Sequence, residues 1–160
     1  MVRIRLAKRN ELDAIYSMYE YRSKWFKENG IKQWSKYTKN HPKKKFSNEL
    51  KNNLYYVILD DNKIVGGFEL SDDSKYWKDD DSSAKYLYRV VTTKPDIGKY
   101  IFNFCIKYCV DNRYTRLRTF CLLSNKKLVD IYESKYGFHK NGEYSTEYNT
   151  YALLEMEVNG

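Results

Sequence analysis

The chain has 160 residues, which is enough for one domain with a single core, so we expect residues 1–160 to form one domain. Its 29 Lys and Arg residues outnumber the 21 Asp and Glu residues, and the net charge of +8 favours anionic partners without specifying a fold. Apolar residues make up 42% and aromatic residues 17%, which excludes a largely disordered chain. The sequence has no long apolar run, which argues against a transmembrane helix and a membrane partner.

The first strand is predicted over residues 2–6, where apolar and basic residues alternate. This alternation is unlike the continuous apolar run of a signal peptide, so we expect a cytoplasmic protein. A helix is predicted over 10–29, because Asn10 can cap it, the apolar residues between Leu12 and Phe26 recur at helical spacing, and Asn29 and a glycine end the pattern.

The next segment is less regular. Its basic stretch Lys43–Lys45 is interpreted as a solvated loop before a short helix at 46–53. Two β-rich segments, 54–59 and 64–70, flank turn residues and predict a hairpin, and the pair Gly66 and Gly67 in the second arm indicates a bulge. The acidic, polar segment 71–83 predicts an exposed loop that could act as a lid.

The second half of the chain predicts four strands, at 84–93, 117–123, 139–145 and 149–158, and two helices, at 99–112 and 125–135. Cys105 and Cys109 share the apolar face of the first of these helices, so we interpret both as buried apolar groups. The three cysteines contain no CxxC pair and there are only two histidines. The sequence therefore predicts neither a disulfide framework nor a metal site.

The segment from Tyr86 to Lys99 combines a strand, a short turn and a helix that opens at Gly98. A helix N-terminus presents unpaired amides and a partial positive charge, and a glycine there lets an anion approach the main chain. Lys94 and Lys99 add positive charge. The turn could therefore hold a diphosphate, although the same residues would also suit a turn that only connects a strand to a helix.

A second group of residues gives the chain a recognisable pattern. Asn125 follows a predicted strand, Tyr132 and Glu133 follow within the next helix, and Gly137 and Phe138 enter another strand. This segment resembles the last third of the GNAT superfamily of N-acetyltransferases. The similarity to one bacterial small-molecule branch continues upstream, in the same order, through Gln33-Trp34, Tyr55-Tyr56-Val57, Ile64-Val65-Gly66, Tyr76-Trp77 and Tyr86-Leu87-Tyr88-Arg89.

The resemblance implies a mixed α/β fold with a central, mostly antiparallel, seven-stranded sheet that is flanked by helices and opens between strands four and five. It also implies an enzyme that transfers the acetyl group of acetyl-CoA to a primary amine by direct attack in a ternary complex. The acceptor would be a small molecule or a peptide, acetyl-CoA would be the co-substrate, no metal would take part, and the protein would be a monomer or a homodimer.

The family's phosphate loop is only partly kept. In the register that preserves the apolar stripe of the helix, Gly98 takes the last small position, Asp96 stands where a glycine is usual, and Thr93 stands where Gln or Arg is usual. A later register would place Phe102 in the crowded turn. The residues that the resemblance assigns to coenzyme A are Val90, Val91, Thr92, Lys94, Asp96, Ile97, Gly98, Lys99, Tyr100 and Asn125.

The resemblance also implies roles in the reaction. Tyr132 is expected to return a proton to the departing thiolate, and Glu69 is a candidate base for the amine. The residues expected at the acceptor pocket are Trp34, Tyr76, Trp77, Tyr88 and Arg89. For several of these residues the sequence leaves a structural alternative open: Tyr132 could be a core tyrosine, Asn125 only a helix cap, and the Trp residues only packing groups.

Two other functions remain open at this point. A degenerate GNAT-fold protein would bind coenzyme A without turnover, which Asp96 and the missing glycines favour. A basic nucleic-acid-binding module would use Lys43–Lys45 and neighbouring tyrosines, but the acidic residues between Asp72 and Asp81 would repel a polyanion.

Overall fold

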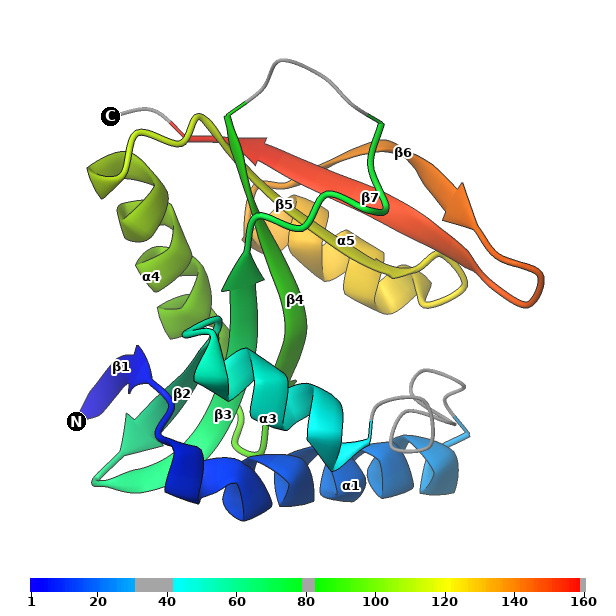
Figure 1. The fold of residues 1–160 in the computed structure, drawn as a ribbon. Helices are drawn as coiled ribbons and strands as arrows, with labels where there is room; N and C mark the ends of the chain where they lie inside the picture. Colours follow the sequence, from blue (N-terminus) through cyan, green and yellow to red (C-terminus); the bar gives the residue numbers. More distant parts are fainter. Residues whose placement is uncertain (31–41, 79–82, 159–160) are drawn as a thin grey trace. The chain divides into compact units, whose positions relative to one another are not determined.

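The structure is a computed structural model that describes residues 1–30, 42–78 and 83–158 (Figure 1). The chain forms two compact units. The first consists of Met1–Glu69 and Arg89–Ile101, and the second of Leu70–Tyr88 and Phe102–Gly160. Strand and helix segments therefore contribute to both units, and each unit is described separately below.

The elements of the described residues follow the predicted order. They are β1 (Val2–Leu6), the short 3-10 helix η1 (Arg9–Glu11), α1 (Leu12–Glu28), α3 (Lys43–Lys51), β2 (Tyr55–Asp60), β3 (Lys63–Ser71), β4 (Ala84–Thr92), α4 (Gly98–Asp111), β5 (Arg116–Leu122), α5 (Lys126–Lys135), β6 (His139–Ser145) and β7 (Thr150–Glu157). None of the helices in these described segments combines the length and apolar character needed to cross a membrane.

The seven strands form one sheet with the order β1-β2-β3-β4-β5-β7-β6. The pairs β1/β2, β2/β3, β5/β7 and β6/β7 are antiparallel, whereas β4 and β5 are parallel. This topology confirms the predicted mixed α/β fold with a mostly antiparallel, seven-stranded sheet. The β4/β5 ladder covers Ala84–Tyr86 and Arg116–Arg118, all in the second unit. The predicted opening beyond this ladder stays a prediction.

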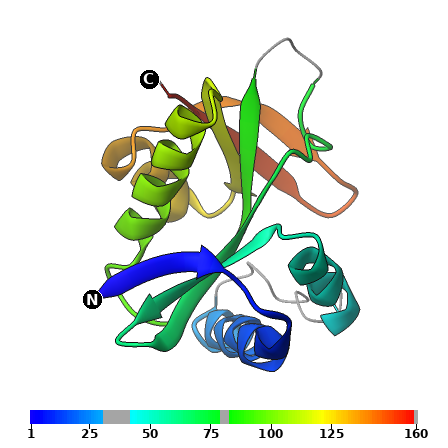
Figure 2. The same ribbon diagram turned by 60° about the vertical axis from the view of Figure 1, so that its left-hand side comes forward.

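The core of the first unit lies between its two helices and the sheet. In Figures 1 and 2, α1 and α3 run beside each other against one face of the N-terminal strands. Helix α1 contributes Ile15, Met18 and Tyr19; Ile15 and Tyr19 lie on the apolar stripe predicted from the sequence, whereas Met18 extends it. Phe46 and Leu50 from α3 complete this core against Tyr55, Val57 and Leu59 of β2 and Val91 of β4.

Two glycines of β3 make room for this core. A Cβ atom at Gly67 would lie 2.7 Å from both Cε1 and Cζ of Tyr55, whose side chain is 1% exposed. A Cβ atom at Gly66 would lie 2.8 Å from the carbonyl oxygen of Val91. The predicted bulge is present one residue earlier, because the register passes from Ile58 opposite Gly66 to Leu59 opposite Ile64.

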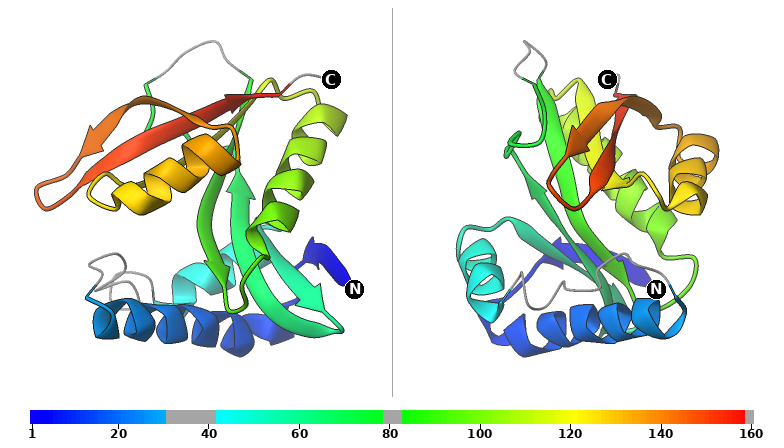
Figure 3. Two further views of the ribbon diagram at one scale, coloured as in Figure 1. Left: turned by 180° about the vertical axis from the view of Figure 1, so that it is seen from behind. Right: turned by 90° about the vertical axis from the view of Figure 1, so that its right-hand side faces the viewer.

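The second unit is built on β5, β7 and β6. Every residue of β5 from Arg116 to Leu122 pairs with β7, and β6 pairs with the other edge of β7. Figure 3 shows α5 packed along one face of β5 and β7. Phe102 of α4 contacts Tyr132 of α5 with a 5.5 Å separation of ring centroids, and it contacts Phe138 at 5.6 Å. These aromatic contacts join α4, α5 and the segment before β6.

The structure corrects the start of the short helix. Helix α3 begins at Lys43 with Pro42 as its N-cap, three residues before the predicted start, and it ends at Lys51. The basic stretch Lys43–Lys45 therefore forms the first turn of a helix and is not a loop. Because proline has no amide hydrogen and a fixed φ, it suits the beginning of a helix, and this signal extends the predicted helix upstream.

The close approach at Gly67 gives a test of the packing. We expect Gly67→Ala to lower the free energy of unfolding by about 1–3 kcal/mol, because the added methyl group overpacks the ring of Tyr55. Urea denaturation measures this change. In a Tyr55→Leu background the same substitution should cost less, since the ring is gone. Equal denaturation midpoints for wild type and Gly67→Ala would contradict the packing account.

Candidate functional site

The turn between β4 and α4 belongs to the first unit and is fixed to β3. The backbone N–H and the hydroxyl group of Thr93 both donate to the carbonyl oxygen of Val65, at 2.9 and 3.2 Å. Asp96 has a φ of +64°, so the turn uses a left-handed backbone without a glycine. Helix α4 then opens at Gly98, and Tyr100 donates its N–H to Ile97 at 3.0 Å. The first amides of α4 therefore follow directly on an anchored, exposed turn.

The charges around this turn suit an anion. Lys94 is 54% exposed and forms an ion pair with Asp60 at the end of β2. Hydrogen bonding to Lys94 lowers the pKa of Asp60, and the same pair raises the pKa of Lys94, so both groups are ionised near neutral pH. The ammonium group of Lys99 lies 5.2 Å from the ring centroid of Tyr100. Two cations and a helix N-terminus therefore accompany Asp96, and this set fits a diphosphate.

The end of β4 carries an irregularity that involves Arg89. This residue has a φ of +57° within the strand, and its carbonyl oxygen accepts a hydrogen bond from the hydroxyl of Tyr19. The Arg89 guanidinium forms a 2.7 Å ion pair with Glu49 of α3 and lies 5.0 Å from the ring centroid of Phe46. Arg89 is thus held by the helices of the first unit, and its predicted role at the acceptor stays a prediction.

Beyond Arg89, β4 presents the residues that the resemblance assigned to the pantetheine arm. Val91 is buried, whereas Val90 and Thr92 are partly exposed. Glu69, the candidate base, lies opposite Tyr55 in β3 and is only 8% exposed. The carboxylate of Glu69 is therefore buried, unlike a solvated carboxylate at an exposed strand end. Its role as a base stays a prediction.

Tyr132, the predicted general acid, lies on α5 in the second unit. Its side chain is 7% exposed and is surrounded by the rings of Phe102 and Phe138, both 5.5 Å away between centroids, and of Tyr136 at 6.3 Å. Burial raises the pKa of Tyr132 far above its ordinary value, and a hydrogen bond with Thr119 of β5 acts in the opposite direction. The phenol therefore keeps its proton over the whole neutral and mildly alkaline range.

Asn125 begins α5 as its N-cap. Its side-chain oxygen accepts a hydrogen bond of 3.3 Å from the backbone N–H of Leu128. The capping alternative that the sequence left open is thus present in the structure. A contact with coenzyme A remains a prediction for the same side chain.

The segment 72–78 places aromatic side chains on the sheet of the second unit. The ring centroid of Tyr76 lies 4.7 Å from Phe120, 5.1 Å from Tyr144 and 5.8 Å from Tyr88. Trp77 covers the guanidinium of Arg118, whose Cζ lies 4.7 Å from its ring centroid. Tyr76, Trp77 and Tyr88 are therefore brought together by the structure, whereas Trp34 lies outside the described residues.

Comparisons with known proteins identify the family of this chain. The family model of the acetyltransferase (GNAT) domain matches residues 23–159. The chain belongs to the GNAT family of acetyltransferases. The superfamily predicted from the sequence is therefore confirmed, and the chain is an enzyme of the acetyltransferase class. No curated protein matches the sequence significantly.

Solved GNAT structures share the fold. A GNAT-family acetyltransferase from Listeria monocytogenes is similar at 20% identity, with a TM-score of 0.80 over 98% of this chain and 94% of the other. The PaiA N-acetyltransferase of Thermoplasma acidophilum, solved in complex with coenzyme A, is 18% identical, with a TM-score of 0.74 over 98% of this chain and 99% of the other. The spermidine N-acetyltransferase of Vibrio cholerae, solved in complex with coenzyme A and spermine, is 15% identical. Its TM-score is 0.66, over 98% of this chain and 95% of the other.

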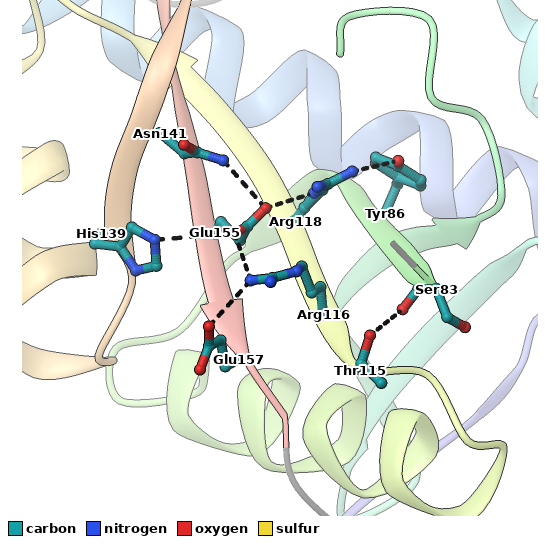
Figure 4. A network of polar contacts seen from close by, with 9 residues as sticks. All are labelled: Ser83, Tyr86, Thr115, Arg116, Arg118, His139, Asn141, Glu155 and Glu157. Carbon is teal, nitrogen blue, oxygen red and sulfur yellow. Dashed lines mark hydrogen bonds and ion pairs between the residues drawn. The ribbon is translucent and has the colours of Figure 1, made fainter. Parts of the chain in front are cut away.

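This GNAT chain contains a polar network that the sequence reasoning missed (Figure 4). Glu155 of β7, 3% exposed, accepts hydrogen bonds from Arg118 at 2.7 Å, from Arg116 at 2.8 Å and from Asn141 at 3.3 Å. Arg118, 2% exposed, also donates to the hydroxyl of Tyr86 at 3.0 Å. Basic residues at alternate positions of one strand, opposite acidic residues at alternate positions of the last strand, were the signal available in the sequence.

The predicted lid is fastened to the sheet over its described part. Asp72 accepts from the ammonium group of Lys85 at 3.3 Å and from the hydroxyl of Tyr114 at 3.1 Å. The hydroxyl of Tyr88 donates to the carbonyl oxygen of Asp73 at 2.7 Å. Lys85 is only 6% exposed, so Asp72 compensates a charge that has left water. The start of the segment 72–78 of this GNAT enzyme is consequently fastened to strand β4 and to Tyr114 in the second unit.

The three cysteines are buried free thiols, and for Cys105 and Cys109 this burial was predicted from the sequence. Burial raises the pKa of Cys109 to about 11 and that of Cys121 to about 12, and it also raises the pKa of Cys105. A buried thiol with a raised pKa supplies almost no thiolate near neutral pH. These side chains therefore lack the ionised form that a nucleophile requires.

The thiol of Cys109 predicts a loss of stability at alkaline pH. In the unfolded chain it ionises from about pH 9, whereas in the native state it holds its proton until about pH 11. The unfolded state then binds fewer protons, so stability falls as the pH rises between these values, by up to about 1.4 kcal/mol per pH unit. Urea denaturation at several pH values should show wild type losing its advantage over Cys109→Ala in this range. The matched variant Val110→Ala should keep a constant difference from wild type, and a pH-independent Cys109→Ala difference would contradict the account.

Proposed function

We propose that residues 1–160 act as one GNAT domain that transfers the acetyl group of acetyl-CoA to a primary amine by direct attack in a ternary complex. The match of residues 23–159 to the acetyltransferase (GNAT) domain carries this proposal. The anchored turn before α4 and the buried phenol of Tyr132 support it, because the reaction needs an anion site for the cofactor and an acid for the leaving group.

Acetyl-CoA is proposed to bind through main-chain and basic groups. The amides at Gly98 and Lys99 would receive its diphosphate at the N-terminus of α4, with Ile97 and Tyr100 flanking them. Lys94 would exchange part of its contact with Asp60 for the phosphate oxygens, and Asp96 would turn to solvent. Val90, Val91, Thr92 and Asn125 would contact the pantetheine arm. The coenzyme A complex of the Thermoplasma PaiA enzyme supports a cofactor of this kind in a fold of this kind.

The proposed reaction transfers the acetyl group from the thioester to the amine, with one proton leaving the amine and one reaching the thiolate. The nitrogen of the neutral amine attacks the thioester carbonyl carbon, a C–N bond forms and the C–S bond breaks. The departing thiolate takes the hydroxyl proton of Tyr132, and the phenolate regains a proton from water. The amine loses its proton to Glu69 or to a water molecule. The buried, protonated thiols of Cys105, Cys109 and Cys121 support direct transfer, because an acyl-cysteine intermediate would require a thiolate.

The acceptor is proposed to be a small-molecule or peptide amine. Trp34, Tyr76, Trp77, Tyr88 and Arg89 are the residues proposed to bind it, and the clustering of Tyr76 with Tyr88 supports a shared aromatic surface. Because the Vibrio neighbour binds spermine, polyamines belong in the amine panel beside amino acids and peptides. Free thiols agree with a reducing cytoplasm, and the active form is proposed to be a monomer or a homodimer.

A second function is favoured by one observation. Asp96 brings a carboxylate to the turn where the family has a glycine, and repulsion of the diphosphate would weaken the cofactor site. A protein that binds coenzyme A without turnover is therefore the alternative. Acetylation of any amine in the panel would exclude it, and binding of acetyl-CoA without product would favour it.

The cofactor site is tested by ligand binding. We expect acetyl-CoA to raise the melting temperature, since a ligand that binds only the native state stabilises it. Gly98→Val should raise the KM for acetyl-CoA by about tenfold or more, because a branched side chain at the first residue of α4 blocks the close approach of a phosphate. Lys107→Val places the same side chain on α4 nine positions later and should leave this KM unchanged. An unaltered KM for Gly98→Val would contradict the assigned phosphate site.

The acid is tested by Tyr132→Phe. This change removes only the hydroxyl group, so kcat should fall by about 10²-fold while the KM for acetyl-CoA stays nearly constant. Tyr136→Phe removes a hydroxyl from the neighbouring ring and should keep kcat. Steady-state kinetics with the best amine of the panel measures both. Full turnover by Tyr132→Phe at every pH would exclude this residue as the acid.

A further inference from the structure

We propose that Tyr19 is a positioning residue for coenzyme A: its buried hydroxyl group holds the main chain of β4 at Arg89 and thereby aims residues 90–92 at the pantetheine arm. This inference rests on the proposed contact between residues 90–92 and that arm. Tyr19 lies on α1 and Arg89 on β4, and both belong to the first unit, as residues 90–92 do.

Two tyrosine hydroxyl groups and one carbonyl group form a chain of hydrogen bonds in the core of this unit. The hydroxyl oxygens of Tyr19 and Tyr55 lie 2.7 Å apart, and the Tyr19 hydroxyl donates to the carbonyl oxygen of Arg89. Because a carbonyl oxygen only accepts, the single hydroxyl hydrogen of Tyr19 points to Arg89, and Tyr55 donates to Tyr19. Both tyrosine side chains are buried, so their hydroxyl groups have left water and depend on protein partners.

The main chain at Arg89 needs such a contact. Its φ of +57° lies in the left-handed region, although Arg89 stands within β4 and carries a side chain that disfavours this backbone. A conformation of this kind persists only where surrounding groups fix it, and it often marks a functional position. The ion pair with Glu49 holds the end of the Arg89 side chain, whereas the Tyr19 hydroxyl acts on the main chain itself.

Residues 90–92 are fixed at both ends. After them, Thr93 donates from its backbone N–H and its hydroxyl group to the carbonyl oxygen of Val65, at 2.9 and 3.2 Å. Before them, the chain is held through the Arg89 carbonyl group. Between these anchors Val91 is buried in the core that contains Tyr19, and its two neighbours are partly exposed. The backbone direction at Arg89 therefore decides how the partly exposed residues are presented.

Strand β3 leaves room for this chain of hydrogen bonds. The atom nearest to a Cβ atom at Gly67 would be the hydroxyl oxygen of Tyr55, followed by two carbons of its ring. Gly67 therefore accommodates the hydroxyl group as well as the ring. With Tyr55 in this place, its hydroxyl group reaches Tyr19 and orients the Tyr19 hydroxyl toward β4.

The test separates the two halves of coenzyme A. Tyr19→Phe removes the hydroxyl group and keeps the ring, which contacts Phe46 at 4.8 Å between centroids. We expect the Kd of coenzyme A, measured by isothermal titration calorimetry, to rise about threefold to tenfold, the range of one lost hydrogen bond. The Kd of phosphoadenosine diphosphate, which keeps the diphosphate and lacks the pantetheine arm, should stay unchanged. The KM for acetyl-CoA should rise while kcat stays nearly constant, a split that a mere loss of folded protein would not produce.

Two further variants complete the comparison. Tyr55→Phe removes the donor to Tyr19 and should raise the Kd of coenzyme A by a smaller factor. Added to Tyr19→Phe, it should cause no further rise, because Tyr55 acts through the Tyr19 hydroxyl. The matched control is Tyr21→Phe, which removes a hydroxyl group from a side chain of the same helix that is 56% exposed. It should leave both dissociation constants unchanged.

Several results would overturn the inference. One is an unchanged Kd of coenzyme A in Tyr19→Phe, and another is an equal rise for coenzyme A and for phosphoadenosine diphosphate. If Tyr19→Phe does not fold, Tyr55→Phe decides in the same way, since its rise must also be confined to coenzyme A. A wild-type protein that does not bind coenzyme A would instead refute the proposed function, which is a different outcome from equal affinities of wild type and Tyr19→Phe.

Discussion

The first unit depends on the polar contacts that hold Arg89 in place. A left-handed residue inside a strand is strained, and it persists only when neighbouring groups fix it. Here the hydroxyl of Tyr19 donates to the Arg89 carbonyl oxygen, Tyr55 bonds that hydroxyl at 2.7 Å, and Glu49 holds the guanidinium. Helices α1 and α3, strand β2 and strand β4 therefore meet at one residue. The glycines at 66 and 67 follow from the same crowding, since Tyr55 and Val91 occupy the space that Cβ atoms would need.

In the second unit, the two faces of strand β5 carry different kinds of side chain. Along β5, Arg118 belongs to a buried network of charges, while Thr119 lies with the aromatic groups around Tyr132. If β5 shifted by one residue against β7, the side chains on its two faces would exchange these environments. The pairing of all seven β5 residues with β7 fixes this register, and it separates the charged network from the phenol.

Much of the fold could be predicted from local pattern, and much of the site could not. Alternating or β-rich segments predicted the strands, and helical spacing predicted helix α1 with Ile15 and Tyr19 on its buried stripe. Resemblance to the family then gave the strand topology, which spacing alone does not specify. The start of α3 was missed because three lysines suggest a solvated loop, whereas Pro42 begins a helix. Glu155 was missed because its partners are distant in sequence, so only the folded chain brings them together.

The ion pair between Lys94 and Asp60 reduces the attraction that the turn between β4 and α4 can offer to an anion. A lysine that already has a carboxylate partner gives little net attraction to an arriving polyanion, because one favourable contact is replaced by another of similar strength. If this turn holds a diphosphate, as proposed, discrimination of that group rests on the fixed dipoles of the main chain at the start of α4. A diphosphate site of that kind would select for a compact, correctly shaped anion over a merely highly charged one.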